Sequence, residues 1–209
     1  PAVAGGFPLM KGMLGMHGNV GPNRKTAECD VLIAIGMRFD DRVTGDLKTY
    51  AKQAKIIHFD IDPAEIEKNV KVDVAVLANV KESLPAVTAL LKEASHKDWV
   101  DSFKEHEDEE WQRVIEPEIH PTAGPITMGE VINMVSEKAA ANAVLATDVG
   151  QNQMMACRYF KLQSNRSLVT SGGLGTMGFG LPAAIGAAIG APEREVCLFT
   201  GDGGIQMTI

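Results

Sequence analysis

The sequence is poor in cysteine, since its 209 residues contain only Cys29, Cys157 and Cys197. They are odd in number and widely spaced, and they form no CxxC pair and have no neighbouring histidine partner. Secreted domains held by disulfides have denser, even-numbered sets of cysteines, and zinc sites have closely spaced pairs. The pattern therefore argues against both and predicts reduced thiols in the core of a cytoplasmic protein.

A run of basic residues and a long apolar segment are also missing. The formal net charge is −7, which argues against nucleic acid as the main partner, although backbone amides and a metal ion can still hold an anionic cofactor. The most apolar stretch, 180–191, includes Pro182 and is far shorter than the roughly 20 residues that span a bilayer. No signal-like segment opens the chain, which starts without methionine and stops after a Gly-rich turn, so we expect it to be part of a longer protein.

What is present is an apolar content of 45%, enough for a substantial core. Residues 31–36, 55–62 and 73–80 are short apolar runs typical of buried parallel strands. Pro63 predicts a helix start after the second run, and helical spacing is evident in Leu84, Val87, Leu90 and Leu91. This βαβ pattern predicts a doubly wound parallel sheet.

Residues 95–125 differ in character and predict a linker. Residues 96–116 are strongly charged and predict an amphipathic helix, which Pro117, Pro121 and Pro125 follow. The run 106–110 contains metal-ligand residue types, but a solvated helix face is the favoured interpretation.

A second α/β unit is predicted after Thr127. A shared helix face is expected for Met128, Val131, Ile132 and Val135. Strands are expected at 143–148, 167–171 and 195–202, and helices at 151–159 and 177–190. No repeat at solenoid spacing interrupts this pattern.

The sharpest chemical feature is Gly201-Asp202-Gly203-Gly204, directly after the last apolar strand. An aspartate at the carboxyl end of such a strand faces the ligand crevice of a doubly wound sheet, and its carboxylate suits Mg²⁺ bridging a diphosphate. The flanking glycines allow phosphate oxygens to approach the backbone. The alternative is an ordinary turn that Asp202 caps.

A rival pattern lies just upstream, where Gly173, Gly175 and Gly178 spell GxGxxG after a predicted strand, with Asp202 at the spacing of a ribose-binding acid. This is formally a dinucleotide fingerprint. The bulky side chains of Met177 and Phe179 inside the supposed phosphate turn argue against it.

Several segments together resemble one family: GMLGMHG at 12–18, GMRFDDRVTG at 36–45, DVGQNQM at 148–154, and TSGGLGTMGFGLPAAIGAAIGA at 170–191 followed by TGDGG. The chain closely resembles the catalytic subunits of acetolactate synthases (acetohydroxyacid synthases), which use thiamine diphosphate. The resemblance implies two incomplete doubly wound α/β domains: the end of a central FAD-binding domain at 1–94, a linker at 95–125, and the start of a diphosphate-binding domain at 126–209.

The same resemblance implies the site residues. Those for thiamine diphosphate are Val149, Gly150, Gln151, Asn152, Gly175, Met177, Asp202, Gly203 and Gly204, with Asp202 also ligating Mg²⁺. Those for FAD are Gly15, Met16, His17, Gly36, Arg38, Asp40, Arg42, Val43, Asp60 and Ile61. The chain departs from the family at Asn152, where relatives often carry histidine, and at Asn79, where they often carry aspartate. No catalytic residue is expected here, because the activating glutamate belongs to a preceding domain and the second metal ligand, an asparagine, to a following segment.

Two alternatives stay open from the residues themselves: core packing for Met177, and an internal salt-bridge network for Arg38, Asp40, Asp41 and Arg42.

The resemblance implies an enzyme that decarboxylates pyruvate and transfers the hydroxyethyl unit to a second 2-ketoacid, with FAD bound without a net redox role. It implies a homodimer or higher oligomer and a possible regulatory small subunit, in branched-chain amino-acid synthesis. The rivals are a sister enzyme such as pyruvate oxidase or glyoxylate carboligase, a nicotinamide dehydrogenase, and a non-catalytic binding module. We expect this chain alone to be inactive.

Overall fold

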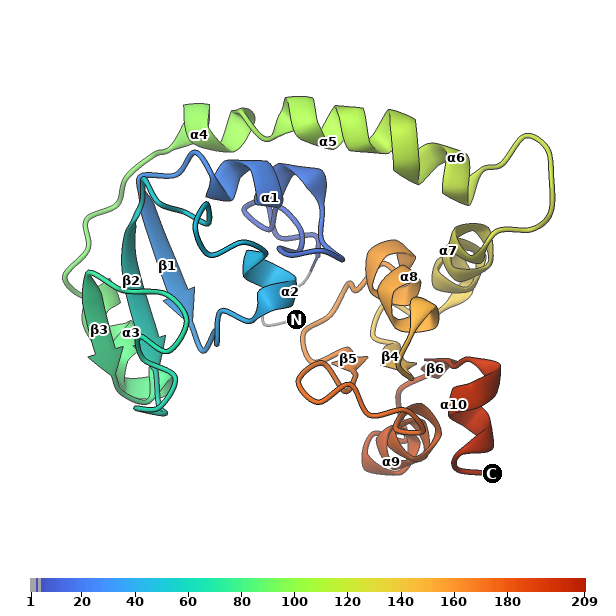
Figure 1. Ribbon diagram of the computed structural model, residues 1–209. Helices are drawn as coiled ribbons and strands as arrows, with labels where there is room; N and C mark the ends of the chain where they lie inside the picture. The colour runs from blue at the N-terminus through green and yellow to red at the C-terminus, as the bar shows by residue number, and fades with distance from the viewer. Residues whose placement is uncertain (1–2, 4) are drawn as a thin grey trace. The chain divides into compact units, whose positions relative to one another are not determined.

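The computed structural model describes residues 3 and 5–209, so residues 1, 2 and 4 of the predicted first domain lie outside it. The chain forms two compact units. One is Lys11–Glu107, and the other joins Asp108–Ile209 to the N-terminal segment that ends at Met10. Each unit is built on a three-stranded parallel sheet, which confirms the predicted fold class (Figure 1).

The sheet of the first unit has the order β1-β2-β3 and matches the three apolar runs. Its strands are β1 (Val31–Ile35), β2 (Lys55–Asp60) and β3 (Val74–Leu77). Ile33 pairs with Ile57, which pairs with Val74. β-branched side chains fit such a pleated surface, and β2, the central strand, is the most deeply buried of the three.

The helices of this unit correct two predictions. They are α1 (Val20–Thr26), α2 (Asp41–Thr44), α3 (Val80–Thr88) and α4 (Lys97–Asp101). The helix expected at Pro63 is wrong, because the Asp62 carboxylate accepts the Ala64 N–H at 2.8 Å and closes a turn there. The helix expected from Leu84 onward is present as α3, but it ends at Thr88 and leaves Leu90 and Leu91 exposed.

The charged segment is helical, as predicted. After α4 it consists of α5 (Lys104–Glu110), the π-helical turn η1 (Trp111–Ile115) and α6 (Glu116–Ile119). Pro117 lies in the first turn of α6, where its missing N–H is tolerated. Glu110 is buried and pairs with Arg158. The solvated face predicted at 106–110 is therefore wrong at Glu110, whose carboxylate faces the protein interior.

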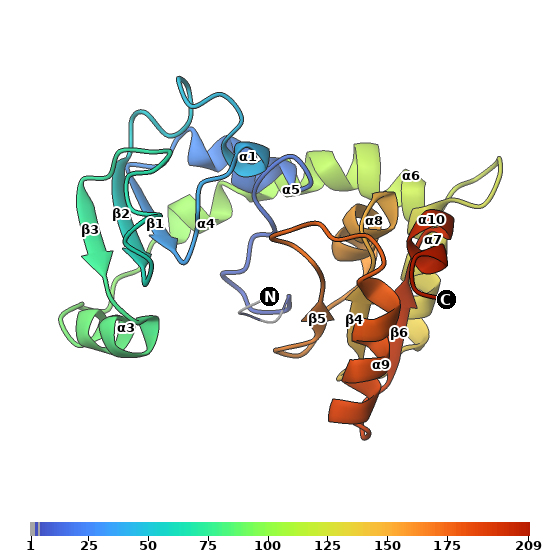
Figure 2. The same ribbon diagram turned by 60° about the horizontal axis from the view of Figure 1, so that its bottom comes forward.

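The sheet of the second unit has the order β5-β4-β6, with β4 (Val144–Thr147) between β5 (Leu168–Val169) and β6 (Val196–Phe199). Its helices are α7 (Met128–Lys138), α8 (Gln151–Tyr159), α9 (Gly180–Gly190) and α10 (Asp202–Gln206). The crossovers β4-α8-β5 and β5-α9-β6 run in opposite directions, so their shared handedness puts α8 and α9 on opposite faces of the sheet (Figures 1 and 2). The loops after the three parallel strands therefore share one edge.

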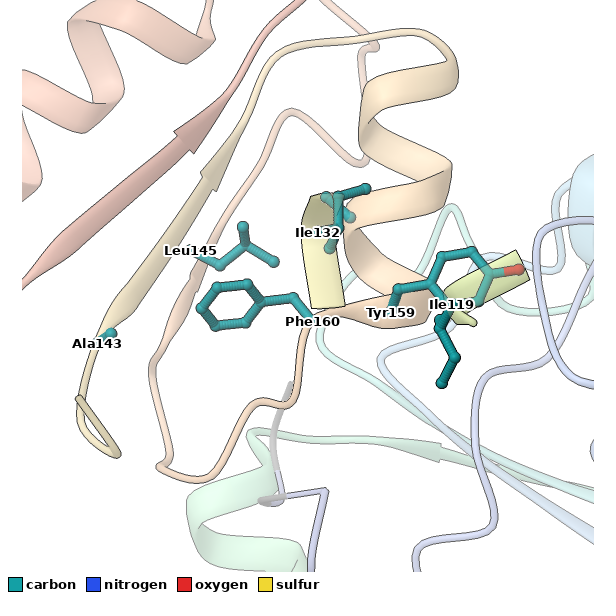
Figure 3. Close-up of a cluster of buried hydrophobic side chains, with 7 residues drawn as sticks. Ile119, Ile132, Ala143, Leu145, Tyr159 and Phe160 are labelled. Carbon is teal, nitrogen blue, oxygen red and sulfur yellow. The ribbon is translucent and has the colours of Figure 1, made fainter. Parts of the chain in front are cut away.

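The core of this unit lies between β4 and helices α6 to α8. Figure 3 shows the Phe160 ring beside Leu145, a fully buried residue of β4. The other members of the cluster are Ile119, Ile132, Ala143, Ala156 and Tyr159. The helix start at Thr127 is confirmed, because its hydroxyl accepts the Glu130 N–H at 3.0 Å.

The face predicted for α7 is only partly correct. Ile132 is buried and Val135 packs against the core, whereas Met128 and Val131 are exposed. The buried face also contains Asn133 and Ser136. Because these residues are polar, a search for apolar residues at helical spacing does not identify this face.

The three cysteines are free thiols, as predicted, and burial raises the pKa of each. Cys29 is buried, and Cys157 and Cys197 are half-buried. Among the described helices, none combines the length and apolar character needed to cross a bilayer.

Candidate functional site

Three loops meet at the carboxyl edge of the second sheet. The loop 148–152 follows β4, the loop 170–180 follows β5, and the turn 200–204 follows β6. The two neighbours of β4 thus place their loops on either side of the β4 loop. This is the edge at which doubly wound sheets bind ligands.

Asp148 connects the three loops. Its side chain is fully buried, and its Oδ1 accepts the N–H groups of Val149 at 2.8 Å and Gly178 at 3.0 Å. Its Oδ2 accepts the Gly180 N–H at 2.8 Å. Burial by itself would raise the pKa of Asp148, but these amide hydrogen bonds outweigh it and hold the pKa below the ordinary value of 3.8.

The Asp148 carboxylate also bears on whether the GxGxxG segment is a dinucleotide-binding loop. In a dinucleotide loop the amides at the start of the helix face a pyrophosphate. Here the N–H groups of Gly178, just before α9, and of Gly180, its first residue, donate to Asp148. The protein thus supplies its own anion at that position, which argues against the nicotinamide alternative.

Two glycines are required by this packing. A methyl group on Gly204 would lie 2.6 Å from Asp148 Oδ1, and one on Gly180 would lie 2.8 Å from the Asp148 nitrogen. Both distances are shorter than any normal carbon contact. Gly204 and Gly180 therefore let the turn after β6 and the start of α9 approach Asp148 closely.

The structure brings most of the predicted thiamine residues together. A Cβ on Gly175 would lie 3.9 Å from Val149 Cγ1, and one on Gly203 would lie 3.5 Å from Met177 Cε. The Asn152 amide nitrogen would lie 3.3 Å from a Cβ on Gly201. The three loops thus approach one another at residues that the sequence singled out.

Met177 and Gln151 differ from the others in exposure. Met177 is 46% exposed, so it is not a core residue in this chain, and Gln151 at the start of α8 is also exposed. Gly150 and Gly175 adopt φ values of 129° and 62°, which favour glycine. An exposed apolar side chain beside such backbone is available to contact a ligand.

Asp202 is exposed at the first position of α10, and its Oδ1 accepts the Gly203 N–H at 2.8 Å. A carboxylate held in this way keeps lone pairs for a cation. Asn152 Oδ1 is buried without a hydrogen-bond partner among the described residues. A carboxylate at the strand end and an unsatisfied amide oxygen fit a hydrated Mg²⁺-diphosphate better than an apolar ligand.

In the unit Lys11–Glu107, two of the predicted FAD-binding segments, 15–17 and 36–43, contact each other. The Met16 N–H donates to the Arg42 carbonyl at 2.8 Å. Gly15 is buried with φ 101°, and a Cβ there would lie 2.9 Å from the same carbonyl and 3.1 Å from Val43 Cα. The loop that contains His17 therefore packs directly on α2.

Asp40 begins α2 and contacts both arginines of its cluster. Its Oδ1 accepts the Arg42 N–H at 3.1 Å, and its Oδ2 lies 3.3 Å from Arg38 Nε. The salt-bridge alternative thus holds for Arg38 and Asp40, whereas Asp41 and Arg42 point to solvent by their exposure. Gly36 ends β1 with φ 59° and open space at its Cβ position.

Asp60 and Ile61 lie at the end of β2 with opposite exposure. Ile61 is 68% exposed, while Asp60 is buried and accepts the Asp62 N–H at 2.9 Å. The second oxygen of Asp60 lies 3.6 Å from His58 Nε2. His58 is fully buried, its ring packs edge-on against Phe39, and among the described residues neither ring nitrogen has a hydrogen-bond partner.

Several residues at these sites escaped the sequence analysis. Asn23 accepts the Gly15 N–H and donates to the Gly15 carbonyl, both at 2.9 Å. Thr170 joins β4 to α8 through Thr147 and Gln153, both at 2.7 Å. The only sequence signal for Asp148 was its position at the end of a predicted strand, as the first residue of the segment DVGQNQM at 148–154.

Comparisons with known proteins agree with this geometry. The family described as thiamine pyrophosphate enzyme, central domain, matches residues 2–87, and the C-terminal TPP binding domain of the same enzymes matches residues 148–209. The probable acetolactate synthase large subunit of Methanocaldococcus jannaschii is 46% identical over 205 residues, which cover 96% of this chain and 34% of that protein.

Two further relatives are similarly placed. The acetolactate synthase large subunit of Lactococcus lactis is 41% identical over 96% of this chain and 34% of its own length. The acetolactate synthase isozyme 2 large subunit of Escherichia coli is 41% identical over the whole chain and 36% of its own length. The chain thus spans about a third of the length of the curated relatives it matches.

Proposed function

Because the chain belongs to the thiamine pyrophosphate enzymes, of which it contains central-domain and C-terminal TPP-binding sequence, we propose that it is part of an acetolactate synthase large subunit. The whole enzyme would decarboxylate pyruvate and transfer the hydroxyethyl unit to pyruvate or 2-ketobutyrate. The observation that carries the proposal is the meeting of loops 148–152, 170–180 and 200–204 at one sheet edge, inside the region that matches the TPP-binding domain.

Thiamine diphosphate would lie across these three loops, with its diphosphate end at the turn after β6. Asp202 would ligate a Mg²⁺ ion that bridges the diphosphate, because its carboxylate is exposed there. Backbone amides of Gly203 and Gly204 would approach the phosphate oxygens opposite Val149, Gly150, Gln151 and Asn152. When bound, the cofactor supplies the electron sink for decarboxylation.

The work of this chain is orientation. Met177 would support the cofactor between its two rings, and the Gly175 carbonyl would accept from the aminopyrimidine. Met177 Cε lies near Gly203, so the proposed apolar support adjoins the proposed diphosphate turn. Orientation of this kind lowers the barrier because the reactive carbon is held where the substrate arrives.

FAD is the second cofactor that we propose, in the unit Lys11–Glu107. The loop 15–17 and the segment Arg38 to Val43 are already joined through the Met16 and Arg42 backbone. The exposed Arg42 guanidinium suits the flavin pyrophosphate, and Gly36 has open space at its Cβ position. Asp60 and exposed Ile61 would lie on the adenosine side.

The assembly is also part of the proposal. We expect a homodimer or higher oligomer in the cytoplasm, with a regulatory small subunit, since the relatives are named large subunits. The substrates would be small 2-ketoacids.

The test is an acetolactate assay on the complete enzyme, with pyruvate, thiamine diphosphate, Mg²⁺ and FAD. Acetolactate formation that stops when thiamine diphosphate or Mg²⁺ is withheld would support the proposal. Pyruvate consumption coupled to flavin reduction and acetate or acetyl phosphate formation would favour a pyruvate oxidase instead.

A further inference from the structure

Asp148 is a buried carboxylate that the proposed function does not use. Such a group is costly to bury unless hydrogen bonds satisfy it, and within the described residues it makes no ion pair. Three backbone N–H groups compensate instead, and two of them come from residues that are 30 and 32 positions away in the sequence. The free energy of that burial is therefore coupled to the position of the loop that contains Gly178.

We propose that Asp148 is the positioning residue of the thiamine site: its carboxylate fixes the loop 172–180 to the end of β4, and the turn at Gly204 packs against it. This inference rests on the proposed function only for the identity of the cofactor that binds there. The fixation itself follows from the contacts of this one side chain.

The geometry explains why the group is an aspartate. Both carboxylate oxygens accept, so an asparagine would turn an NH₂ group toward an amide that also donates. The carboxylate is also closely surrounded, because a Cβ on Gly180 or Gly204 would lie within 3.0 Å of Asp148 atoms. The three amide donors thus favour an ionised carboxylate at this position.

The hydrogen bonds that Asp148 accepts also control the position of the two residues proposed to contact the thiamine rings. Gly175 and Met177 lie in a segment held on one side by Ser171, which accepts the N–H groups of Gly175 and Thr176 at 3.0 Å each, and on the other side by the Gly178 amide that donates to Asp148. With both ends tied, Met177 stays beside Gly203. Loss of the hydrogen bond to Asp148 would leave this short segment held only through Ser171.

The experiment uses the complete enzyme and the variant Asp148→Asn. Hydrogen exchange of the cofactor-free enzyme should be faster in peptides that contain Gly178 and Gly180, while the later turns of α9 keep their protection. In a titration at saturating Mg²⁺, the Kd for thiamine diphosphate should rise about 10- to 100-fold, by analogy with the loss of a residue that orients the ligands of a metal ion.

A matched control is Asn133→Ala, which removes another buried polar group of the same unit, remote from the three loops in the sequence and paired with Glu137. It should lower thermal stability and leave both the exchange at Gly178 and the Kd unchanged. Should Asp148→Asn fail to fold, Gly180→Ala provides the second variant, because its methyl group would lie 2.8–3.0 Å from Asp148 atoms and Gly180 is not itself a proposed cofactor residue.

Faster exchange together with a raised Kd, absent in Asn133→Ala, supports the positioning role. Unchanged exchange at Gly178 and Gly180 in a folded Asp148→Asn enzyme overturns it, as does an equal rise in Kd in the control. If even the wild-type enzyme fails to bind thiamine diphosphate, the proposed function fails, and the exchange experiment still decides the role of Asp148.

Discussion

Gly203 and Gly204 are neighbours in the turn after β6, yet the structure predicts opposite tolerance of a methyl group. In Gly204→Ala the new methyl would lie 2.6 Å from Asp148 Oδ1, 2.8 Å from its Cγ and 3.3 Å from its Oδ2. In Gly203→Ala it would lie 3.5 Å from Met177 Cε, an ordinary contact with the end of a flexible side chain.

The magnitude follows from what has to move. The first methyl is roughly 1 Å too close to a carboxylate that three amide hydrogen bonds hold in place. Overpacking of this kind costs about 1–3 kcal/mol. In a domain of 150–250 residues each kcal/mol lowers the melting temperature by about 2–4 °C, and in a domain of 60–100 residues by about 4–8 °C.

The assay is thermal unfolding of the complete, cofactor-free enzyme, compared among wild type, Gly203→Ala and Gly204→Ala. We expect a lower melting temperature for Gly204→Ala and a value near wild type for Gly203→Ala. Equal melting temperatures for the two variants, or the reverse order, would refute the close packing of Gly204 on Asp148.

The remaining predictions concern metal binding, the core, pH and the isolated chain. In the complete enzyme, Asp202→Ala should weaken Mg²⁺ and thiamine diphosphate binding together, and a calorimetric titration with both affinities unchanged would reduce Asp202 to a turn residue. Leu145→Ala should cost about 2–5 kcal/mol in a denaturant titration, because Leu145 is fully buried in the central strand; a loss below about 1 kcal/mol would contradict its place in the core. The lowered pKa of Asp148 stabilises the fold above its ordinary value of 3.8, and this contribution should disappear as the pH falls through the folded pKa; acid unfolding of Asp148→Asn should lack it. Purified 209-residue chain should form no acetolactate even with all cofactors, and steady turnover would show that catalysis needs no further domain.

Local patterns were sufficient to predict the elements that local chemistry determines. The strand β4 follows from an apolar run, and α8 was predicted with its observed bounds, Gln151–Tyr159. The turn at Pro63 was missed because Asp62 competes for the Ala64 amide, a side-chain bond that outweighed the preference of proline for a helix start.

The site was predictable in its parts but not in its connections. Strand-end position pointed to Asp202, and the resemblance pointed to Gly175 and Met177. The role of Asp148 depends on amides more than two dozen positions away, and the burial of His58 beside Asp60 depends on packing across β2. No local pattern encodes such contacts, because they exist only once the sheet has formed.

The central claim is that the loop 172–180 supports thiamine and is not a dinucleotide loop. The most direct measurement is a paired titration of thiamine diphosphate and NAD on the complete wild-type enzyme and on Met177→Ala, with turnover recorded on the same samples. We predict saturable thiamine diphosphate binding, no NAD binding, and a Met177→Ala enzyme that loses more turnover than diphosphate affinity, because the phosphates keep their contacts while the reactive carbon loses its orientation. Saturable NAD binding to the wild type, with acetolactate formation intact in Met177→Ala, would contradict the account.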